Sequence, residues 1–525
     1  MILLQLISCV LGHEDLSEDE IDEIRAFKLR MLGKMPREFF DQMRYAFAHK
    51  MTISSLYVVT NKLALLSRVH PVWIDCCVNS CIAYTKEYQN ANNCPECNQV
   101  RYRANGRPRR VFCYIPFIPR LQRFFQNRRI RQELLYRHEY QHEPGIIADV
   151  FDCEHYRNLC KTLVTVRGEQ LPHCYFSGKH DIAFSTCLDS YLLYKRRRSG
   201  PSALPIVLQI YNFPSDVRTH LAKLMCLGVI PGPKGPKQLH TFLDPFEDEC
   251  EQLARGVITY DCVDKEWFPL HGYHLFPLGD IIALEKLLNL KGHNGKSPCR
   301  SCEIKVVNNP ESVDNKTYYV PLVFPGQERR WNPRELPLRS HAQWAQVVAE
   351  LDAASTRKFK NQLAMYYGIK GMPAITWVGS VDFARGVPWD FMHLLFENVV
   401  KNLIHLWMGR FKGLDCGDED YEIPLHIWSQ IGVETVDAVK DIPAAFVRSL
   451  GNIADDQASY TAESWAFWFL FLGPSLLKGR LGRKFHNHYL ELVDIMKICL
   501  KFTITLSEVD DLETNIIEWV EKYEK

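Results

Sequence analysis

The chain has 525 residues, of which 46% are hydrophobic and 24% charged, and its formal net charge is +1. This length allows roughly two to four domains, and the near-zero charge means that any affinity for nucleic acid must come from local basic patches. Eighteen cysteines in so long a chain exclude a small disulfide-stapled scaffold and are typical of a reducing compartment.

The N-terminal segment, residues 1 to about 70, is predicted to be a helical region. Its first eleven residues are apolar but lack a basic leading segment, so they do not fit a signal peptide. Ile21, Ile24, Phe27 and Leu29 then recur close to helical spacing among acidic residues. The most apolar later run, 465–472, is too short to cross a bilayer. We therefore expect a soluble protein with no membrane partner.

Two close cysteine pairs follow in residues 71–135. Cys77 and Cys81 form a C-x3-C pair, and after twelve residues Cys94 and Cys97 form a C-x2-C pair. Two such pairs can place four thiolates around one tetrahedral Zn²⁺, which predicts a zinc-ribbon-like module. The neighbouring Cys76 leaves one ligand ambiguous, and the alternative is that these are buried thiols without a metal.

An arginine-rich stretch without acidic residues comes directly after the cysteines. It is interleaved with aromatic residues, a combination that favours contact with phosphate groups of DNA. The alternative is an ordinary solvated face. The ten candidate DNA-binding residues are Arg101, Arg103, Arg107, Arg109, Arg110, Arg120, Arg123, Arg128, Arg129 and Arg131.

Short apolar runs in residues 145–310 predict strands at 181–189, 205–213 and 271–280, separated by helices and Pro/Gly turns. Asp189 and Asp280 each close one of these strands. Carboxylates at the ends of neighbouring strands can share divalent cations, and paired cations support phosphodiester chemistry. For Asp280 the equally weighted alternative is a helix N-cap, because a helix with Leu284 and Leu287 on one face follows it.

A second C-x2-C pair, Cys299 and Cys302, could supply half of another tetrahedral zinc site. His293 is close in sequence, but it sits in a Gly-His-Asn-Gly turn, where an ordinary turn histidine is the simpler interpretation. Beyond about residue 340 the pattern is almost wholly helical. The sequence thus predicts a multidomain α+β or α/β protein with a large helical region over 311–525.

Motifs in a fixed order along the chain resemble the transposases of CACTA-type (En/Spm-like) DNA transposons, especially those of fungi. The matching segments are DCCVNSC (75–81), CPEC (94–97), YIPFIPRLQ (114–122), GVIPGPK (228–234), GD (279–280), KGHNG (291–295), CRSC (299–302), WDFMHL (389–394), ENVV (397–400) and NIADD (452–456). The resemblance extends from about residue 19 to the last residue.

This resemblance implies an RNase H-like core with an Asp-Asp-Glu metal site, for which Asp189 and Asp280 are the matching aspartates. It further implies catalytic Mg²⁺ or Mn²⁺, structural zinc, binding to transposon terminal repeats in the nucleus, and a possible homo-oligomer that joins two DNA ends. Ser190 departs from the family pattern, which has glycine after the first aspartate. Because a missing Cβ can be needed for close backbone approach, this change weakens the expectation of activity.

The third acid of the site is not evident. Glu397 is a candidate within the chain, but the helix expected over 391–407 carries an apolar stripe typical of a packing element. In similar transposases the glutamate lies in a continuation, after a histidine pair that would complete the Cys299/Cys302 zinc site; His486 and His488 are possible substitutes here. We therefore expect a truncated transposase without strand-transfer activity. A non-catalytic DNA-binding regulator and a protein-interaction module built on the C-terminal helices stay open as alternatives.

Overall fold

A computed structural model describes residues 16–67, 69–192, 202–232, 234–308, 318–323, 331–411, 419–443, 445–447 and 450–525. The apolar opening segment lies outside these residues. The chain divides into two compact units. Unit 1 comprises Met1–His142, Val150–Ser301 and Arg339–Pro388, and unit 2 comprises Glu143–Asp149, Cys302–Leu338 and Trp389–Lys525. In the described part of the chain, no helix is long and apolar enough to cross a membrane.

Three helices, α2 (Glu18–Leu32), α3 (Arg37–Ala46) and α4 (Leu56–Ser67), open unit 1. Helix α2 begins with a capping box, in which Ser17 and Glu20 satisfy each other's backbone amides. Its Ile24 and Phe27 are buried together with residues of α4, whereas Leu29 is exposed. The helical spacing at the N-terminus thus marks a small packed helical cluster.

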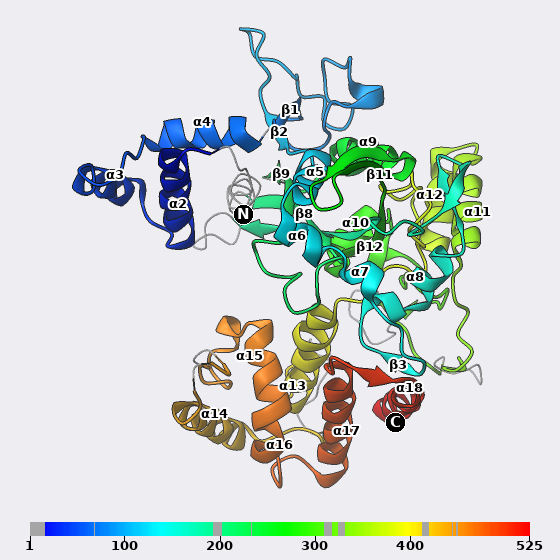
Figure 1. The fold of residues 1–525 in the computed structure, drawn as a ribbon. Coiled ribbons are helices and arrows are strands. Elements are labelled where there is room, and N and C mark those ends of the chain that lie inside the picture. Colours follow the sequence, from blue (N-terminus) through cyan, green and yellow to red (C-terminus); the bar gives the residue numbers. More distant parts are fainter. Residues whose placement is uncertain are drawn as a thin grey trace. The chain divides into compact units, whose positions relative to one another are not determined.

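The centre of unit 1 is a mixed sheet of seven strands (Figure 1). Its main path runs β1-β2-β9-β8-β6-β12, and β7 pairs with β8 beside β6. The strands are β1 (Val72–Asp75), β2 (Val111–Tyr114), β6 (Ile182–Leu188), β7 (Tyr191–Leu192), β8 (Ser202–Ile210), β9 (Met225–Pro231) and β12 (Gly272–Gly279). Neighbours are antiparallel except β6 and β12, which are parallel.

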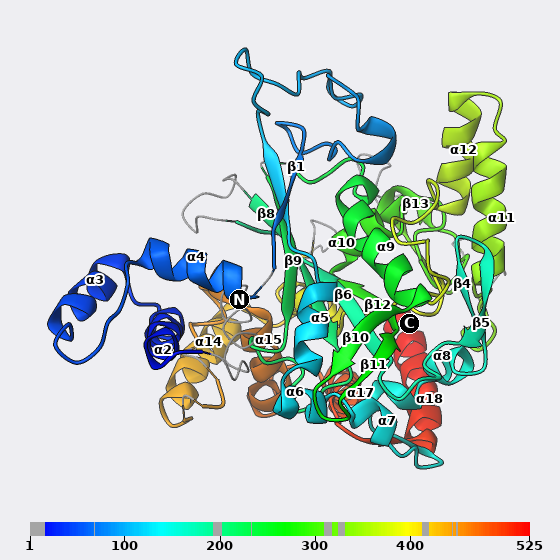
Figure 2. The ribbon, with the colours of Figure 1, turned by 45° about the horizontal axis from the view of Figure 1, so that its top comes forward.

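The three strands predicted from the sequence correspond to β6, β8 and β12, and the predicted mixed α and β class is confirmed. Strand β6 is buried along almost its whole length, as expected for a central strand. Strands β1 and β2 lie on either side of residues 76–110, here called the cysteine segment. The loops of this segment extend from the ends of the two strands (Figure 2). The cysteine segment is therefore attached to the sheet.

Helices and two hairpins surround this sheet. Helix α9 (His240–Arg255) packs on it through Phe242 and Phe246, whose rings contact Phe112, Phe117 and Phe184. The other elements of unit 1 are α5 (Ile118–Phe125), α6 (Arg128–Glu133), α7 (Tyr136–Glu139), α8 (Glu154–Leu159), β4 (Leu163–Val166), β5 (Glu169–Cys174), α9 (His240–Arg255), β10 (Val257–Asp261), β11 (Glu266–Leu270), α10 (Ile281–Leu287), α11 (His341–Asp352) and α12 (Arg357–Tyr367). The last two belong to unit 1 although the predicted helical region starts at 311.

Unit 2 is mainly helical, as predicted for this part of the chain. It contains a π-helix, η4 (Met392–Val400), and continues with α13 (Lys401–Trp407), α14 (Leu425–Lys440), α15 (Ala462–Phe467), η6 (Trp468–Leu472), α16 (Gly473–Leu476), α17 (Arg483–Cys499) and α18 (Leu506–Tyr523). Short strands β3 (Ile146–Ile147) and β15 (Ile504–Thr505) pair with each other, as do β13 (Val307–Asn308) and β14 (Tyr318–Tyr319). Tryptophans such as Trp428, Trp465 and Trp468 fill its core.

Candidate functional site

The two aspartates predicted to bind metal lie just beyond the ends of β6 and β12. These strands are parallel neighbours, and Leu188 is paired with Gly279. Asp189 and Asp280 are the next residues on each strand, so the fold brings their backbones to the same end of the sheet. This placement matches the rule that functional groups gather at the carboxyl ends of parallel strands.

Asp280 is the N-cap of α10. Its Oδ1 accepts a hydrogen bond from the Ala283 amide at 2.6 Å. The N-cap alternative is therefore confirmed, but the cap uses only one of the two carboxylate oxygens of Asp280. No hydrogen bond to Oδ2 occurs within the described residues, and Asp280 is half-buried. The capped position fixes the side chain while leaving one oxygen for a ligand.

Asp189 and Ser190 lie in the interruption between β6 and β7. Strand β8 runs along both, since Leu188 pairs with Ile206 and Tyr191 with Ala203. Pro205 falls in this stretch of β8 and has no amide hydrogen to donate, which accounts for the break in the ladder. Asp189 is exposed.

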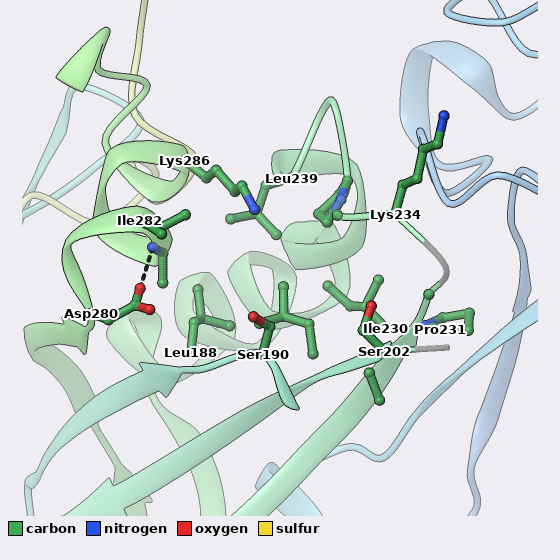
Figure 3. Close-up of a pocket in the computed structure, with 16 residues that line it drawn as sticks. Leu188, Ser190, Ser202, Ile230, Pro231, Lys234, Leu239, Asp280, Ile282 and Lys286 are labelled. Carbon is green, nitrogen blue, oxygen red and sulfur yellow. Dashed lines mark hydrogen bonds between the residues drawn. The ribbon is translucent and has the colours of Figure 1, made fainter. Parts of the chain in front are cut away.

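Figure 3 shows a pocket at this end of the sheet, with a volume of about 90 Å³. Leu188, Ser190 and Asp280 line it, whereas Asp189 does not. The loop after β9, which includes Gly232, Lys234 and Gly235, and Lys286 of α10 line it as well. Sequence reasoning missed Lys286 and this loop, because the GVIPGPK motif gave no indication that it would meet α10.

The four predicted zinc ligands come together. The sulfur atoms of Cys77, Cys81, Cys94 and Cys97 all lie within 4.8 Å of one another, and this cluster could hold a metal such as zinc. Cys77 Sγ and Cys97 Sγ are 3.5 Å apart, close to the separation of about 3.8 Å expected for tetrahedral sulfur ligands at about 2.3 Å from zinc.

Local backbone geometry supports this cluster. Ser80 and Asn98 have positive φ angles of 60° and 54°, which tighten the two turns. The Asn79 amide donates to Cys77 Sγ at 3.3 Å. Burial acts to raise the pKa of Cys97, but hydrogen bonds from the Gln99 amide, Asn79 and neighbouring thiols outweigh it and lower the pKa to about 7. A thiolate, the form that binds metal, is thus accessible near neutral pH.

Cys76 is separate from the cluster. It is 1% exposed and belongs to the main core of unit 1, together with Ala83 and Phe112. Burial raises the pKa of its thiol to about 12. The ambiguity between Cys76 and Cys77 is thereby resolved in favour of Cys77.

Three of the ten candidate DNA-binding arginines are buried. Arg120, 1% exposed, donates to the carbonyls of Pro116, Ile115 and Cys226. Arg123 bonds to Gln126, and Arg131 Nε lies 2.7 Å from Asp261 Oδ2. Because these guanidinium groups are engaged inside unit 1, the structure does not support their assignment to a DNA surface.

Two further arginines hold the cysteine segment together. Arg101 bonds to Asp75 Oδ2 at 2.7 Å and to the Gln89 carbonyl. Arg110 donates to Ser80 Oγ and to the Gly232 carbonyl. Their side chains are largely committed to these contacts.

The remaining five arginines stay candidates for phosphate contact. Arg103 and Arg107 are exposed at a hairpin tip, where the Arg103 amide donates to the Arg107 carbonyl and Gly106 has a φ of 73°. Arg128 and Arg129 are exposed on α6, and Arg109 is half-buried. The hairpin tip is thus a compact basic projection of the cysteine segment.

Glu397 lies on η4 in unit 2, whereas both aspartates are in unit 1. It is 3.9 Å from Lys401 Nζ and partly exposed. The predicted packing of this helix holds at Val399 and Leu403, which belong to the core of unit 2, whereas Leu394 is exposed. Phe396 and Val400 are buried in the same core. The i→i+5 bonding of η4 shifts the buried face relative to an α-helix.

Cys299 and Cys302 are not part of any group of three or more potential metal ligands in the described chain. His293 lies in a short 3₁₀ turn, as its sequence context suggested. His486 Nε2 contacts the Pro474 carbonyl, and His488 Nε2 contacts the Trp519 carbonyl at 2.9 Å. The second zinc site therefore stays a prediction.

A further group with ligand-like spacing consists of His180, Asp261 and Asp264. Arg131 bonds to both of its carboxylates, and Lys179 Nζ lies 3.1 Å from Asp264. Burial lowers the pKa of His180 to about 4, with Arg131 contributing. These cations already neutralise the two aspartates, so the group is a structural charge cluster.

Residues 171–343 match the transposase family tnp2. The match begins in β5 and ends in α11. It includes β6, β8, β9, α9, β12 and both aspartates, and it supports a relationship of this chain to a transposase family. No curated protein matches the chain.

Proposed function

We propose that the chain is a CACTA-type, fungal DNA transposase-like protein that binds transposon ends in the nucleus and holds divalent metal at Asp189 and Asp280 for DNA cleavage and strand transfer. The observation that carries this proposal is the tnp2 match, which spans the sheet segment containing both aspartates. A homo-oligomer would bring two DNA ends together.

The strand arrangement supports an RNase H-like core. Antiparallel β6, β8 and β9 are followed by helix α9 and then by β12, which returns parallel to β6. The aspartates at the paired ends of β6 and β12 are then the core's first two metal ligands, and carboxylate oxygens suit Mg²⁺ and Mn²⁺.

The chemistry assigned to this site is metal-assisted phosphodiester cleavage. Divalent cations, when bound, supply activation of water and stabilisation of the leaving oxygen. Asp280 contributes Oδ2, because Oδ1 is committed to the Ala283 amide. The Cys77/Cys81/Cys94/Cys97 cluster holds structural zinc, and the hairpin with Arg103 and Arg107 contacts DNA phosphates.

A specific observation favours a second function, a DNA-binding derivative that regulates related elements without cutting DNA. Within the described residues, no group of three potential metal ligands contains Asp189 or Asp280. Two carboxylates that lack a third acidic partner do not hold a pair of metal ions firmly in place.

The salt dependence of DNA binding tests what both functions share. In the full chain bound to a mixed-sequence duplex, replacing Arg103 and Arg107 by Ala should flatten the slope of log affinity against log salt by about two units. The reason is that each lost phosphate contact lowers the steepness of this slope by about 0.9. The control is the double Ala replacement of Arg357 and Arg385, exposed arginines elsewhere in unit 1, which should leave the slope unchanged. Equal slopes for all three proteins would contradict DNA contact by the hairpin.

Incubation with Mn²⁺ and a duplex carrying the terminal repeats of the encoding element separates the two functions. Cleavage by the wild-type chain that is lost in Asp280→Asn supports the transposase. If the separate variant Glu397→Gln also loses cleavage, Glu397 is the third acid. DNA binding without cleavage supports the regulator.

A further inference from the structure

The pocket beside Asp280 has a size and lining suited to a small anion. Its volume of about 90 Å³ is enclosed by three pieces of unit 1: the end of β6 with Ser190, the start of β8 with Ser202, and the loop after β9. Asp280 and Lys286 of the β12–α10 segment close it (Figure 3).

Lys286 provides a positive charge at this pocket. Figure 3 shows its side chain extending toward the pocket, whereas Lys234 extends away from it. A Cβ added at Gly235 would lie 2.8 Å from Lys286 Nζ, so the absence of a side chain at Gly235 leaves room for the ammonium group. In the described parts of the chain, no carboxylate lies within ion-pair distance of Lys286.

Other lysines add to the local positive potential. Burial lowers the pKa of Lys370, and the nearby charges of Lys291 and Lys286 lower it further, against the opposing effect of Glu285. Lys291 and Lys370 do not line the pocket, but their charges add to the positive potential around Lys286.

The wall opposite Lys286 is held by the cysteine segment. The amides of Lys237 and Gln238 both donate to the Cys81 carbonyl at 3.0 Å. Ser80 Oγ and Arg110 donate to the Gly232 carbonyl. The loop that faces Lys286 is therefore fixed at both ends, which preorganises the pocket.

We propose that this pocket binds one phosphate group of a nucleic-acid backbone next to Asp280, with Lys286 as its cationic ligand. The proposal rests on the proposed function and deepens it by identifying where the chain holds the phosphodiester. A lysine ammonium is a common point-charge ligand for phosphate, and its place beside the carboxylate would bring the phosphate to the metal ligands.

Binding of inorganic phosphate to the full chain in EDTA, measured by calorimetry or phosphorus NMR, tests this site without divalent metal. Lys286→Ala should weaken phosphate affinity by at least about tenfold, since a hydrogen bond to a charged group is lost. Gly235→Ala should also weaken it, because the added methyl group displaces Lys286 Nζ without removing charge. Lys286→Arg should retain part of the affinity.

The control is Lys161→Ala, which removes an exposed lysine of unit 1 away from the pocket and should leave phosphate affinity unchanged. No phosphate binding by the wild-type chain, or equal affinity in Lys286→Ala and wild type, would overturn the proposal. Duplex binding and Mn²⁺ binding are measured on the same proteins. If the chain binds duplex DNA and Mn²⁺ but not phosphate, the phosphate subsite alone is wrong. If it binds phosphate but neither duplex DNA nor Mn²⁺, the proposed function is wrong.

Discussion

Replacing Cys77 by Ser in the full-length chain is expected to abolish binding of about one zinc ion and to lower the free energy of unfolding by more than about 4 kcal/mol, the range in which loss of a structural metal falls. The physical reason is that the four thiols lie within 4.8 Å of one another and bind the metal as a set, so that loss of one ligand removes binding free energy that is coupled to folding. Metal analysis and denaturant unfolding measure the two effects.

The adjacent Cys76 is the matched control. The Cys76→Ser chain should still bind zinc. Its free energy of unfolding should fall by about 1–3 kcal/mol, because a hydroxyl is buried in the core. The full chain is required because β1 and β2 belong to the main sheet and α5 is buried in the core. Less than half an equivalent of zinc in the wild-type chain, or equal zinc loss in both variants, would contradict the cysteine assignment.

Arg131→Met should destabilise the chain by about 3–5 kcal/mol, because it leaves Asp261 buried without its guanidinium partner. Burial acts to raise the pKa of Asp261, but Arg131 and the amides of Val263 and Asp264 outweigh it and keep the pKa below its usual value. A depressed pKa contributes stability above the unfolded value of about 3.9 and loses it as the pH falls. The difference in free energy of unfolding between Arg131→Met and wild type should therefore become smaller at acidic pH.

The neighbouring Arg128 offers the comparison for this variant, because it is exposed on the same short helix. Arg128→Met should change stability by no more than about 0.5 kcal/mol. Denaturant unfolding at pH 7 and at about pH 3, below the unfolded pKa, measures both proteins. Similar stabilities for the two variants would show that Arg131 is not a structural residue.

Three strands of the sheet could be predicted because they consist mainly of apolar residues. Strands β6, β8 and β12 fall within a few residues of the expected ranges. Strand β9 was missed, since Gly228 and Pro231 break the pattern of β-forming residues. Strands β1 and β2 have four residues each, too few to show a clear alternating pattern beside the cysteine segment.

The arginines show why charge counts alone could not define a surface. Arg120 and Arg123 are buried on α5 together with Leu121, Phe124 and Phe125, because most of this short helix faces the core. The acidic partners of Arg131 lie in and just after β10, about 130 residues away in sequence. Which arginines face inward is therefore decided by long-range packing that no local pattern contains.

The convergence of the four cysteines was predictable because close cysteine pairs are typical of zinc sites, and spacing is a local property. The placement of Asp189 and Asp280 at one end of the sheet depends on the parallel pairing of β6 and β12, which no local sequence pattern contains. The pocket with Lys286 depends on contacts between the loop after β9, α10 and the cysteine segment. These three segments are far apart in sequence.

Manganese binding to the zinc-loaded chain, measured by electron paramagnetic resonance with Asp280→Asn as the comparison, tests the proposed metal site most directly. Asn is as good an N-cap as Asp, so this variant keeps helix α10 while removing the charge. We expect Asp280→Asn and Asp189→Asn each to weaken Mn²⁺ binding by more than about tenfold. Asp264→Asn, in the separate charge cluster, should leave it unchanged. Equal Mn²⁺ affinity in wild type and Asp280→Asn, or loss in Asp264→Asn alone, would contradict a divalent metal site at the ends of β6 and β12.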